Sequence, residues 1–272
     1  MKKLLVFIFL STGFLPVFAQ DSTSTASDAS MITNRPGFTE ASRAVFKSGF
    51  QIESGFQYKK SPDYKGSESY SEGLFIPNLG LLYGVSKNVE IRIFGNLDGT
   101  RYHSSVWTSD YSYSLTGLVV GAKINLTQAK GALPEMALLL TEGFPTNNIG
   151  IQTWSTSALL AWSYSLPANF GLSGNLGYTL EYQFEDNMSL TNPSYFNYTV
   201  NLGYSIKENL GTYVEFYGAS NIGDGTGIST SMTGGLWYRF NPKLQVDLLG
   251  GYGFDAGSYL FNVGFSWLIL NK

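Results

Sequence analysis

Residues 196–206 read FNYTVNLGYSI, and this stretch decides the fold. Every second residue, from Phe196 to Ile206, is aromatic or aliphatic, and the residues between them are small or polar. Successive side chains of a β-strand point to opposite faces, so a period of two predicts a strand with one apolar and one polar face. The windows 49–59, 89–98 and 170–183 alternate in the same way. The sequence therefore predicts several strands of ten or more residues.

Twelve segments with strand character follow one another along the chain, although 73–85 and 133–142 alternate poorly. They are 49–59, 73–85, 89–98, 113–126, 133–142, 153–165, 170–183, 194–206, 211–222, 227–240, 244–255 and 258–270. Every second connection is a short turn: 86–88, the stretch around 130–131, 167–169, 207–209 and 241–243. The other connections are mostly longer and polar (60–72, 99–112, 143–152 and 184–193), whereas 223–226 and 256–257 are brief.

Short turns at one end, longer loops at the other and an even number of long strands are typical of an outer-membrane β-barrel. Such a sheet must close on itself, because hydrocarbon cannot form hydrogen bonds with an exposed sheet edge. The alternative is a soluble β-sandwich, whose strands usually have only about 5 to 6 residues. We therefore expect an all-β fold, a transmembrane antiparallel β-barrel of about twelve strands in the outer membrane of a Gram-negative-type bacterium.

Aromatic residues recur near the short turns. Four tyrosines lie three residues before the start of a short turn, and one tryptophan lies near the C-terminus: Tyr83, Tyr164, Tyr204, Tyr238 and Trp267. Aromatic side chains gather at the interface between membrane and water, so we predict a ring of membrane-interface aromatics at this end. The alternative is that these tyrosines belong to a core.

The first 48 residues differ from the rest of the chain. Two lysines precede an apolar run over 4–10, and Val17-Phe18-Ala19 supplies small residues for cleavage, so residues 1–19 are predicted to be a signal peptide. A transmembrane anchor would need about 20 apolar residues, but polar residues and Pro16 interrupt this run. We divide the chain into a signal peptide (1–19), a periplasmic or lumenal N-terminal segment (20–48) and the barrel (49–272).

Composition excludes several classes of function. The 272 residues include 17 Lys and Arg, one His and no Cys, with a net charge of −3. This balance lacks the basic surface of a nucleic-acid-binding protein, and the chain has no thiol for catalysis. With a single His and no Cys we expect neither a metal site nor a cofactor.

A catalytic site is not expected either. We interpret His103 as a solvated loop residue and the Glu185–Asp186 pair as solvated carboxylates. A hydrolase embedded in the membrane would require His103 to lie against a serine. We therefore predict that the protein is not an enzyme.

Both ends of the predicted barrel region resemble one family. Residues 33–57, TNRPGFTEASRAVFKSGFQIESGFQ, resemble the opening of a family of outer-membrane transporters of the phenol meta-cleavage pathway, whose members begin T-D-R-P-D-x-T-E-S and continue with a Gly and an I-E-x-G strand. The matching positions are Thr33, Arg35, Pro36, Thr39, Glu40, Gly49, Ile52, Glu53 and Gly55, whereas Asn34, Gly37 and Ala41 depart from the pattern. Residues 251–269 resemble the end of the family. The resemblance implies a barrel that transports small molecules.

Charged side chains of both signs are predicted to line the lumen, which argues against a filter of one sign. The candidates are Glu53, Glu90, Arg92, Lys123, Glu181, Glu215, Arg239 and Asp247. Arg35, Glu40 and Arg43 precede the first strand and are candidates for an N-terminal plug. In that case Arg35 would pair with an inward carboxylate such as Glu53 or Glu90. The alternative is a periplasmic extension that only positions the first strand.

We therefore expect a channel or transporter for small hydrophobic or aromatic molecules. Eight strands give a filled interior and sixteen to eighteen an aqueous channel, so twelve strands leave conduction open. The alternative is a non-conducting barrel that anchors or adheres through its extracellular loops. The expected partners are outer-membrane lipid, a small-molecule solute and the barrel-assembly machinery.

Overall fold

The computed structural model describes residues 31–146, 152–184, 190–222 and 227–270. The predicted signal peptide, residues 20–30, the Glu185–Asp186 pair and the turn 223–226 lie outside the described residues. The described strands are β1 (Gly49–Pro62), β2 (Tyr70–Gly84), β3 (Val89–His103), β4 (Ser112–Thr127), β5 (Glu135–Phe144), β6 (Gln152–Ser165), β7 (Phe170–Phe184), β8 (Leu190–Thr191), β9 (Ser194–Lys207), β10 (Leu210–Asn221), β11 (Ser229–Asn241), β12 (Leu244–Gly253) and β13 (Ser258–Leu270).

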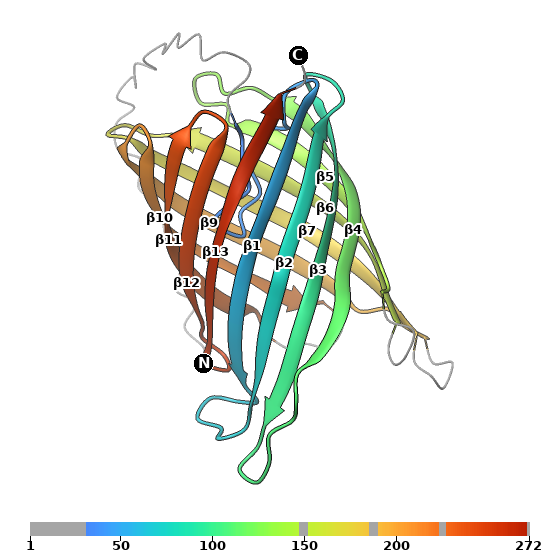
Figure 1. Cartoon of the computed structure of the whole chain (residues 1–272). Coiled ribbons are helices and arrows are strands. Elements are labelled where there is room, and N and C mark those ends of the chain that lie inside the picture. The colour runs from blue at the N-terminus through green and yellow to red at the C-terminus, as the bar shows by residue number, and fades with distance from the viewer. Residues whose placement is uncertain (1–30, 147–151, 185–189, 223–226, 271–272) are drawn as a thin grey trace, which may run out of the picture.

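Twelve long strands form one closed antiparallel barrel (Figure 1). Each long strand pairs with its neighbours in the chain, and β1 pairs with β13 in a register that sets Ile52 opposite Trp267. The two-residue strand β8 pairs only with the end of β7. The prediction of an all-β barrel of twelve strands is confirmed. Among the described residues, no helix is long and apolar enough to cross a membrane.

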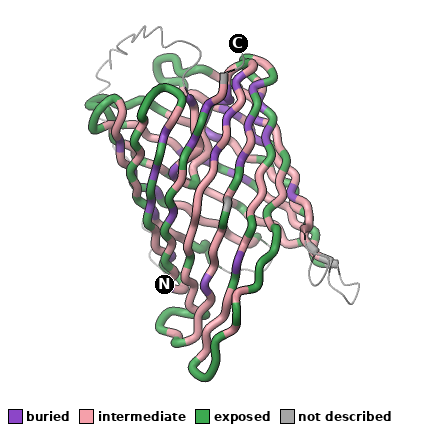
Figure 2. Tube along the Cα trace, viewed as in Figure 1, coloured by how far each residue is buried: buried purple, intermediate pink, exposed green. Residues whose placement is uncertain are grey.

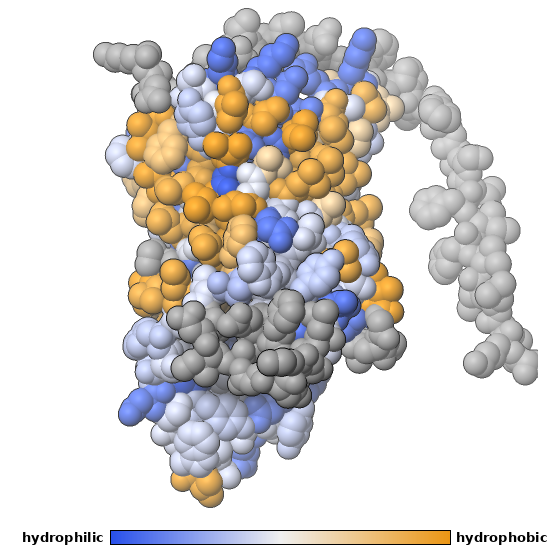
Figure 3. Space-filling model, turned by 90° about the vertical axis from the view of Figure 1, so that its right-hand side faces the viewer, coloured by the Kyte–Doolittle hydropathy of each residue, from blue (hydrophilic) through white to orange (hydrophobic). Residues whose placement is uncertain are grey.

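The strands have an apolar outer face and an inner face with many polar residues. On β9, Val200 points outward and is 43% exposed, whereas the next residue, Asn201, lines a cavity inside the barrel. A broad apolar band covers the outer surface in one half of the molecule, and a more polar surface continues toward the long loops (Figure 3). All five aromatic residues predicted for the membrane interface are exposed near the ends of their strands: Tyr83, Tyr164, Tyr204, Tyr238 and Trp267.

The two segments with poor alternation have different physical causes. In β2 the register with β1 and β3 shifts between Phe75 and Asn78, so a bulge breaks the period of two. In β5 both faces are apolar: Ala137 and Leu139 are buried, while Leu140 is exposed on the outside. Neither irregularity interrupts the barrel.

The barrel has two different ends. The short turns lie at one end, together with residue 31 and the end of β13. These turns are 85–88, 128–134, 166–169, 208–209 and 242–243. The hairpins β1–β2 and β3–β4 extend furthest at the other end (Figure 1). Buried residues concentrate in the half of the barrel near the short turns, where an additional segment fills the lumen (Figure 2).

This arrangement predicts the orientation in the membrane. Short turns of outer-membrane barrels lie in the periplasm, so the hairpin loops 63–69 and 104–111 should be extracellular. Cysteines introduced by Ser67→Cys and Ser104→Cys should react on intact cells with a membrane-impermeant thiol reagent. Asn209→Cys, in the turn between β9 and β10, is the matched control and should react only after the cells are opened. The opposite labelling pattern would invert the orientation.

Candidate functional site: a lumenal segment and its wall contacts

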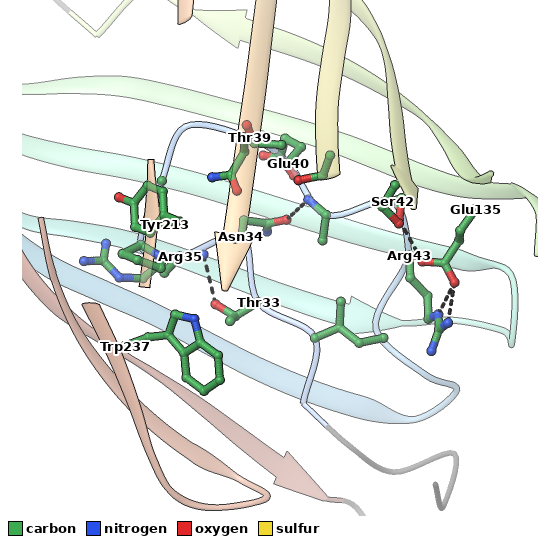
Figure 4. A pocket seen from close by; sticks show the side chains of 18 of the residues that line it. Thr33, Asn34, Arg35, Thr39, Glu40, Ser42, Arg43, Glu135, Tyr213 and Trp237 are labelled. Carbon is green, nitrogen blue, oxygen red and sulfur yellow. Dashed lines mark hydrogen bonds and ion pairs between the residues drawn. The ribbon is translucent and has the colours of Figure 1, made fainter. Parts of the chain in front are cut away.

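Residues 31–48 lie inside the barrel, and we call them the lumenal segment (Figures 1 and 4). The segment begins where the Met31 amide donates to the carbonyl of Pro242 at 3.3 Å, and it ends where the Ser48 amide donates to the carbonyl of Gly84 at 2.7 Å. Both points lie at the end with the short turns. Between them the chain folds back on itself, because the Ala41 amide donates to Asn34 Oδ1 at 3.1 Å.

The base of the lumenal segment is apolar. Met31 and Val45 pack against Leu82 and Leu268 in a buried cluster, which Phe46 and Phe94 extend. Burying side chains of this size stabilises the docked segment by roughly 1.5 to 3 kcal/mol per residue. The segment is therefore anchored at the short-turn end by hydrophobic packing, while its remaining contacts with the wall are mainly polar.

Arg35 makes the most buried ion pair between the segment and the wall. Its Nε and Nη2 atoms donate to the two carboxylate oxygens of Asp247 at 3.1 and 2.8 Å, and Nη2 also donates to Asn262 Oδ1 at 2.5 Å. Arg35 therefore pairs with an inward carboxylate as predicted, but the partner is Asp247 and not Glu53 or Glu90. Asp247 on β12 lies opposite Gly264 on β13, and this register brings its carboxylate to the guanidinium.

Two glycines make room for the Arg35 guanidinium. A Cβ atom at Gly264 would lie 2.0 Å from Arg35 Nη2, and a Cβ atom at Gly55 would lie 2.8 Å from the same nitrogen. Gly55 and Gly264 are opposite each other in the β1–β13 ladder. The wall therefore contains a slot, free of side chains, that fits this arginine.

Glu53 and Glu215 bind polar groups of the segment. Glu53 Oε1 accepts from Thr33 Oγ1 at 2.9 Å and from the Asn34 amide at 3.0 Å. Glu215 accepts from the Phe38 amide at 2.9 Å, from the Thr39 amide at 2.6 Å and from Thr39 Oγ1 at 2.6 Å. The lumenal segment has no regular secondary structure, and these two carboxylates satisfy backbone N–H groups that would otherwise lose their hydrogen bonds.

Glu40 lies in a network of alternating charge. Its Oε2 atom accepts from Arg92 at 2.7 Å and pairs with Lys123 Nζ at 3.0 Å, and Arg92 also pairs with Glu90 at 2.5 Å. Burial by itself would raise the pKa of the Glu40 carboxyl, but the charges of Arg92 and Lys123 outweigh it and lower the pKa to about 2. Glu40 is therefore ionised at neutral pH.

Arg43 and Ser42 join the segment to β5. Both side chains donate to the carboxylate of Glu135, Ser42 at 2.7 Å and Arg43 Nε at 2.8 Å (Figure 4). The Arg43 side chain is 57% exposed, so solvent weakens this ion pair. The Arg35 and Glu40 contacts are far less exposed and dominate the polar anchoring.

Six of the eight predicted lumen residues contact the lumenal segment: Glu53, Glu90, Arg92, Lys123, Glu215 and Asp247. The other two bond within the wall, where Glu181 accepts from Gln183 at 2.8 Å and Arg239 donates to Gln245 at 3.5 Å. Glu135 was not predicted, because it begins a segment that alternates poorly, although it binds Ser42 and Arg43. The predicted set holds only charged residues, so it lacks Asn175, which binds the Glu40 amide at 2.8 Å, and Asn262, which binds Arg35. Both asparagines lie on the inner face of strands with clear alternation.

The lumenal segment separates two cavities. One, of about 330 Å³, reaches Ser163, Asn201 and Trp237 near the short turns (Figure 4). The other, of about 220 Å³, reaches Gln57, Asn78 and Leu249 on the side of the long loops. Both are lined by Asn34–Gly37 and Glu40, so these five residues form the partition.

His103 is the remaining catalytic candidate within the described residues. His103 ends β3 and is not a solvated loop residue: its two ring nitrogens lie 3.0 Å from Thr108 Oγ1 and 3.1 Å from Glu72 Oε2. No serine in the described part of the chain forms a hydrogen bond with the His103 ring. In the same part, no group of three or more His, Asp or Glu side chains could hold a metal ion.

A closed barrel with an apolar exterior and a lumenal N-terminal segment defines a class: this is an integral β-barrel protein of the bacterial outer membrane. The family model described as "Putative MetA-pathway of phenol degradation" matches residues 33–269, and the chain belongs to this family. The match includes most of the lumenal segment and nearly the whole barrel. A comparison with curated proteins gave no match.

Solved structures support the same fold. The COG4313 outer membrane channel from Pseudomonas putida F1 is 11% identical, with a TM-score of 0.68 over 86% of this chain and 99% of that chain. The translocator domain of the autotransporter NalP from Neisseria meningitidis is 12% identical, with a TM-score of 0.55 over 80% and 88% of the two chains. The CymD monoaromatic hydrocarbon channel is 11% identical, with a TM-score of 0.50 over 83% and 90%.

The Arg35 slot supports a prediction about docking of the segment. Arg35→Ala removes the partner of Asp247, and breaking a buried ion pair costs about 3 to 5 kcal/mol. The segment should therefore leave its docked position more often, and single-channel recordings should show more frequent steps to higher current. Gly264→Ala should act in the same direction, because its Cβ would overlap the guanidinium.

Gly203→Ala is the matched control for the glycine substitution. Gly203 also lines the lumen, but the nearest atom to its added Cβ would be 3.8 Å away, which is an ordinary contact. Its recordings should equal those of the unmodified protein. If Gly264→Ala and Gly203→Ala gave the same traces, the slot would not hold the segment.

Proposed function

We propose that the protein is a channel for small hydrophobic or aromatic molecules across the outer membrane. The observation that carries the proposal is the pair of cavities, one on each side of a partition that consists of a single segment. This segment belongs to the N-terminal part of the chain and not to the wall, so it can move while the twelve strands keep their hydrogen bonds. Transport, not catalysis, is the role that the family and the fold support.

The cavities suit a molecule with one ring. A cavity of about 150 Å³ holds benzene, and the two cavities here measure about 330 and 220 Å³. Tyr213 and Trp237 line the first, and Phe38 and Phe94 line the second. Phe38 stacks on Tyr217 with ring centroids 4.3 Å apart, so the segment presents an aromatic ring toward the long loops.

Both comparisons agree with a solute of this kind. The family description names phenol degradation, and the CymD structure is that of a channel for monoaromatic hydrocarbons. The mixed polar and aromatic lining of both cavities would suit a ring that carries a hydroxyl group. Insertion into the membrane by the barrel-assembly machinery is part of the same proposal, which the closed barrel supports.

Conductance in a planar lipid bilayer tests the proposal. The purified full chain should conduct ions, and phenol added on the extracellular side should reduce the current in a saturable way as it occupies the cavities. Phe38→Ala should weaken this block, because it removes the stacked ring. A barrel that serves only as an anchor or adhesin would show no current above the lipid baseline, and a current that phenol leaves unchanged would contradict the aromatic assignment.

A further inference from the structure

A row of charged residues lies on the outer face of the barrel, toward the long loops. Lys60 on β1 lies opposite Glu72 in the β1–β2 ladder, and Glu72 lies opposite Arg101 in the β2–β3 ladder. The row faces outward because the next row, Lys59–Gly73–Thr100, continues the inner face that includes Gln57. Three charged side chains therefore share one level outside the lumen, where they take no part in the channel.

Glu72 is saturated with donors. It accepts from Tyr58 at 2.7 Å, from Arg101 Nε at 2.5 Å and from His103 Nε2 at 3.1 Å. Its side chain is only 11% exposed. Glu72 therefore fixes the position of its neighbours and has little capacity left for a cation from solution.

The two basic groups keep donors for a ligand. The Lys60 ammonium lies 3.6 Å from the centre of the Tyr70 ring, and the Arg101 guanidinium lies 4.7 Å from the centre of the Tyr111 ring. Within the described part of the chain, Lys60 Nζ and the terminal nitrogens of Arg101 donate no hydrogen bond. Such paired cations suit an anion with several oxygens, above all a phosphate.

The row lies at the level of lipid headgroups. On the other side of β1, Lys60 lies opposite Tyr259 of β13, and Tyr259 lies opposite Tyr252 of β12. The Tyr259 residue is 58% exposed. Exposed tyrosines in such a row mark the interface between hydrocarbon and water. On the membrane side of the row, exposed apolar residues follow on β3 and the neighbouring β4, including Leu97 and Leu115. The surface changes from apolar to polar toward the loops (Figure 3).

An apolar hollow lies on β2, β3 and β4, between the row and the short-turn end of the barrel. Its volume is about 260 Å³, and its lining includes Leu79, Leu81, Ile93, Leu97, Leu115 and Leu118. Gly95 also lines it, and nothing lies within 4 Å of the place where its Cβ would be. Gly95 and Arg101 are six residues apart on the outer face of β3, which is about 20 Å at 3.3 Å per residue. An acyl chain spans a distance of this order.

We propose that this face binds one phosphorylated glycolipid of the outer leaflet. Its phosphate would contact Lys60 and Arg101, its sugar would lie on the neighbouring tyrosines, and one acyl chain would occupy the hollow. The site requires only that the barrel sits in the outer membrane, so it is independent of the proposed channel function. Its role would be to hold the barrel at a fixed depth beside the lipids of the outer leaflet.

Binding of purified lipopolysaccharide to the full chain in detergent tests the proposal. The double variant Lys60→Gln/Arg101→Gln should bind phosphorylated lipopolysaccharide at least ten-fold more weakly, as measured by native mass spectrometry. The matched control Lys87→Gln/Lys130→Gln removes two exposed charges from the short-turn end and should bind as the unmodified chain does. Arg101→Lys keeps the charge and should retain most of the affinity. Unchanged affinity in the first variant would overturn the proposal.

Three further measurements separate the parts of the site. Dephosphorylated lipopolysaccharide should bind weakly and equally to the unmodified chain and to the double variant. Gly95→Leu should fill the hollow and weaken binding of both lipids without changing the conductance. Inorganic phosphate and phosphatidylglycerol at matched phosphate concentration should not displace the glycolipid, and displacement by either would contradict the assignment to a glycolipid.

Discussion

Deletion of residues 21–40 is expected to raise the single-channel conductance several-fold while the barrel still assembles. The deletion removes Arg35 and Glu40 from their partners on the wall, and it removes all five residues that form the partition. The first strand begins only at Gly49, so every strand pairing of the barrel remains possible. Water can enter the opened lumen and solvate the carboxylates that the segment leaves behind, which avoids the cost of buried charges without partners.

A deletion of residues 21–30 alone is the matched control, because it keeps every described contact of the lumenal segment. Its conductance should equal that of the unmodified chain. Equal conductance of both deletions would mean that the segment does not obstruct the channel, and it would leave the barrel assignment intact. Heat-dependent migration in gels would show that both deleted proteins are folded.

Val200→Arg is expected to destabilise the barrel strongly. Val200 lies near the middle of β9, between Gly174 and Phe216 on the neighbouring strands, and it faces outward. An arginine on the lipid face at the centre of the bilayer costs roughly 2 to 4 kcal/mol. Denaturant unfolding in lipid vesicles should therefore show a loss of this size, or the variant should fail to insert.

Asn201→Arg is the control at the adjacent position. Asn201 faces the lumen and is opposite Glu215 on β10, so the introduced guanidinium would meet water and a carboxylate. This variant should keep the stability of the unmodified chain and change mainly the selectivity of the channel. Equal stability of the two variants would show that β9 has a different register or lies outside the membrane.

The lumenal segment combines two kinds of anchoring with different consequences. Its apolar base buries Met31 and Val45 at the short-turn end, whereas its tip is held by side chains such as Asp247, Glu215 and Arg92. Polar contacts in a lumen exchange with water, and the net contribution of a hydrogen bond to a charged group is about 1.5 to 3 kcal/mol. The tip can therefore detach while the base stays docked, which would open the partition without releasing the whole segment.

The sequence by itself determined the barrel. A period of two over ten or more residues can be read in most strands separately, and the alternation of short and long connections orders the strands. For this reason the predicted strand 170–183 and the observed strand Phe170–Phe184 agree within one residue. The direction of Val200 and Asn201 followed from the same pattern, because it depends only on the local backbone.

Only the tertiary structure decided where the lumenal segment binds. Residues 31–48 have no periodicity, and their partners come from strands up to 233 residues away in the chain, such as Ser266 for Thr33. Which carboxylate meets Arg35 depends on the register of β12 against β13 and on the slot at Gly55 and Gly264, and neither is encoded in a local pattern. Charge and alternation identified the inward carboxylates, but closure of the barrel selected Asp247 over Glu53 and Glu90, because only closure sets the distances across the lumen.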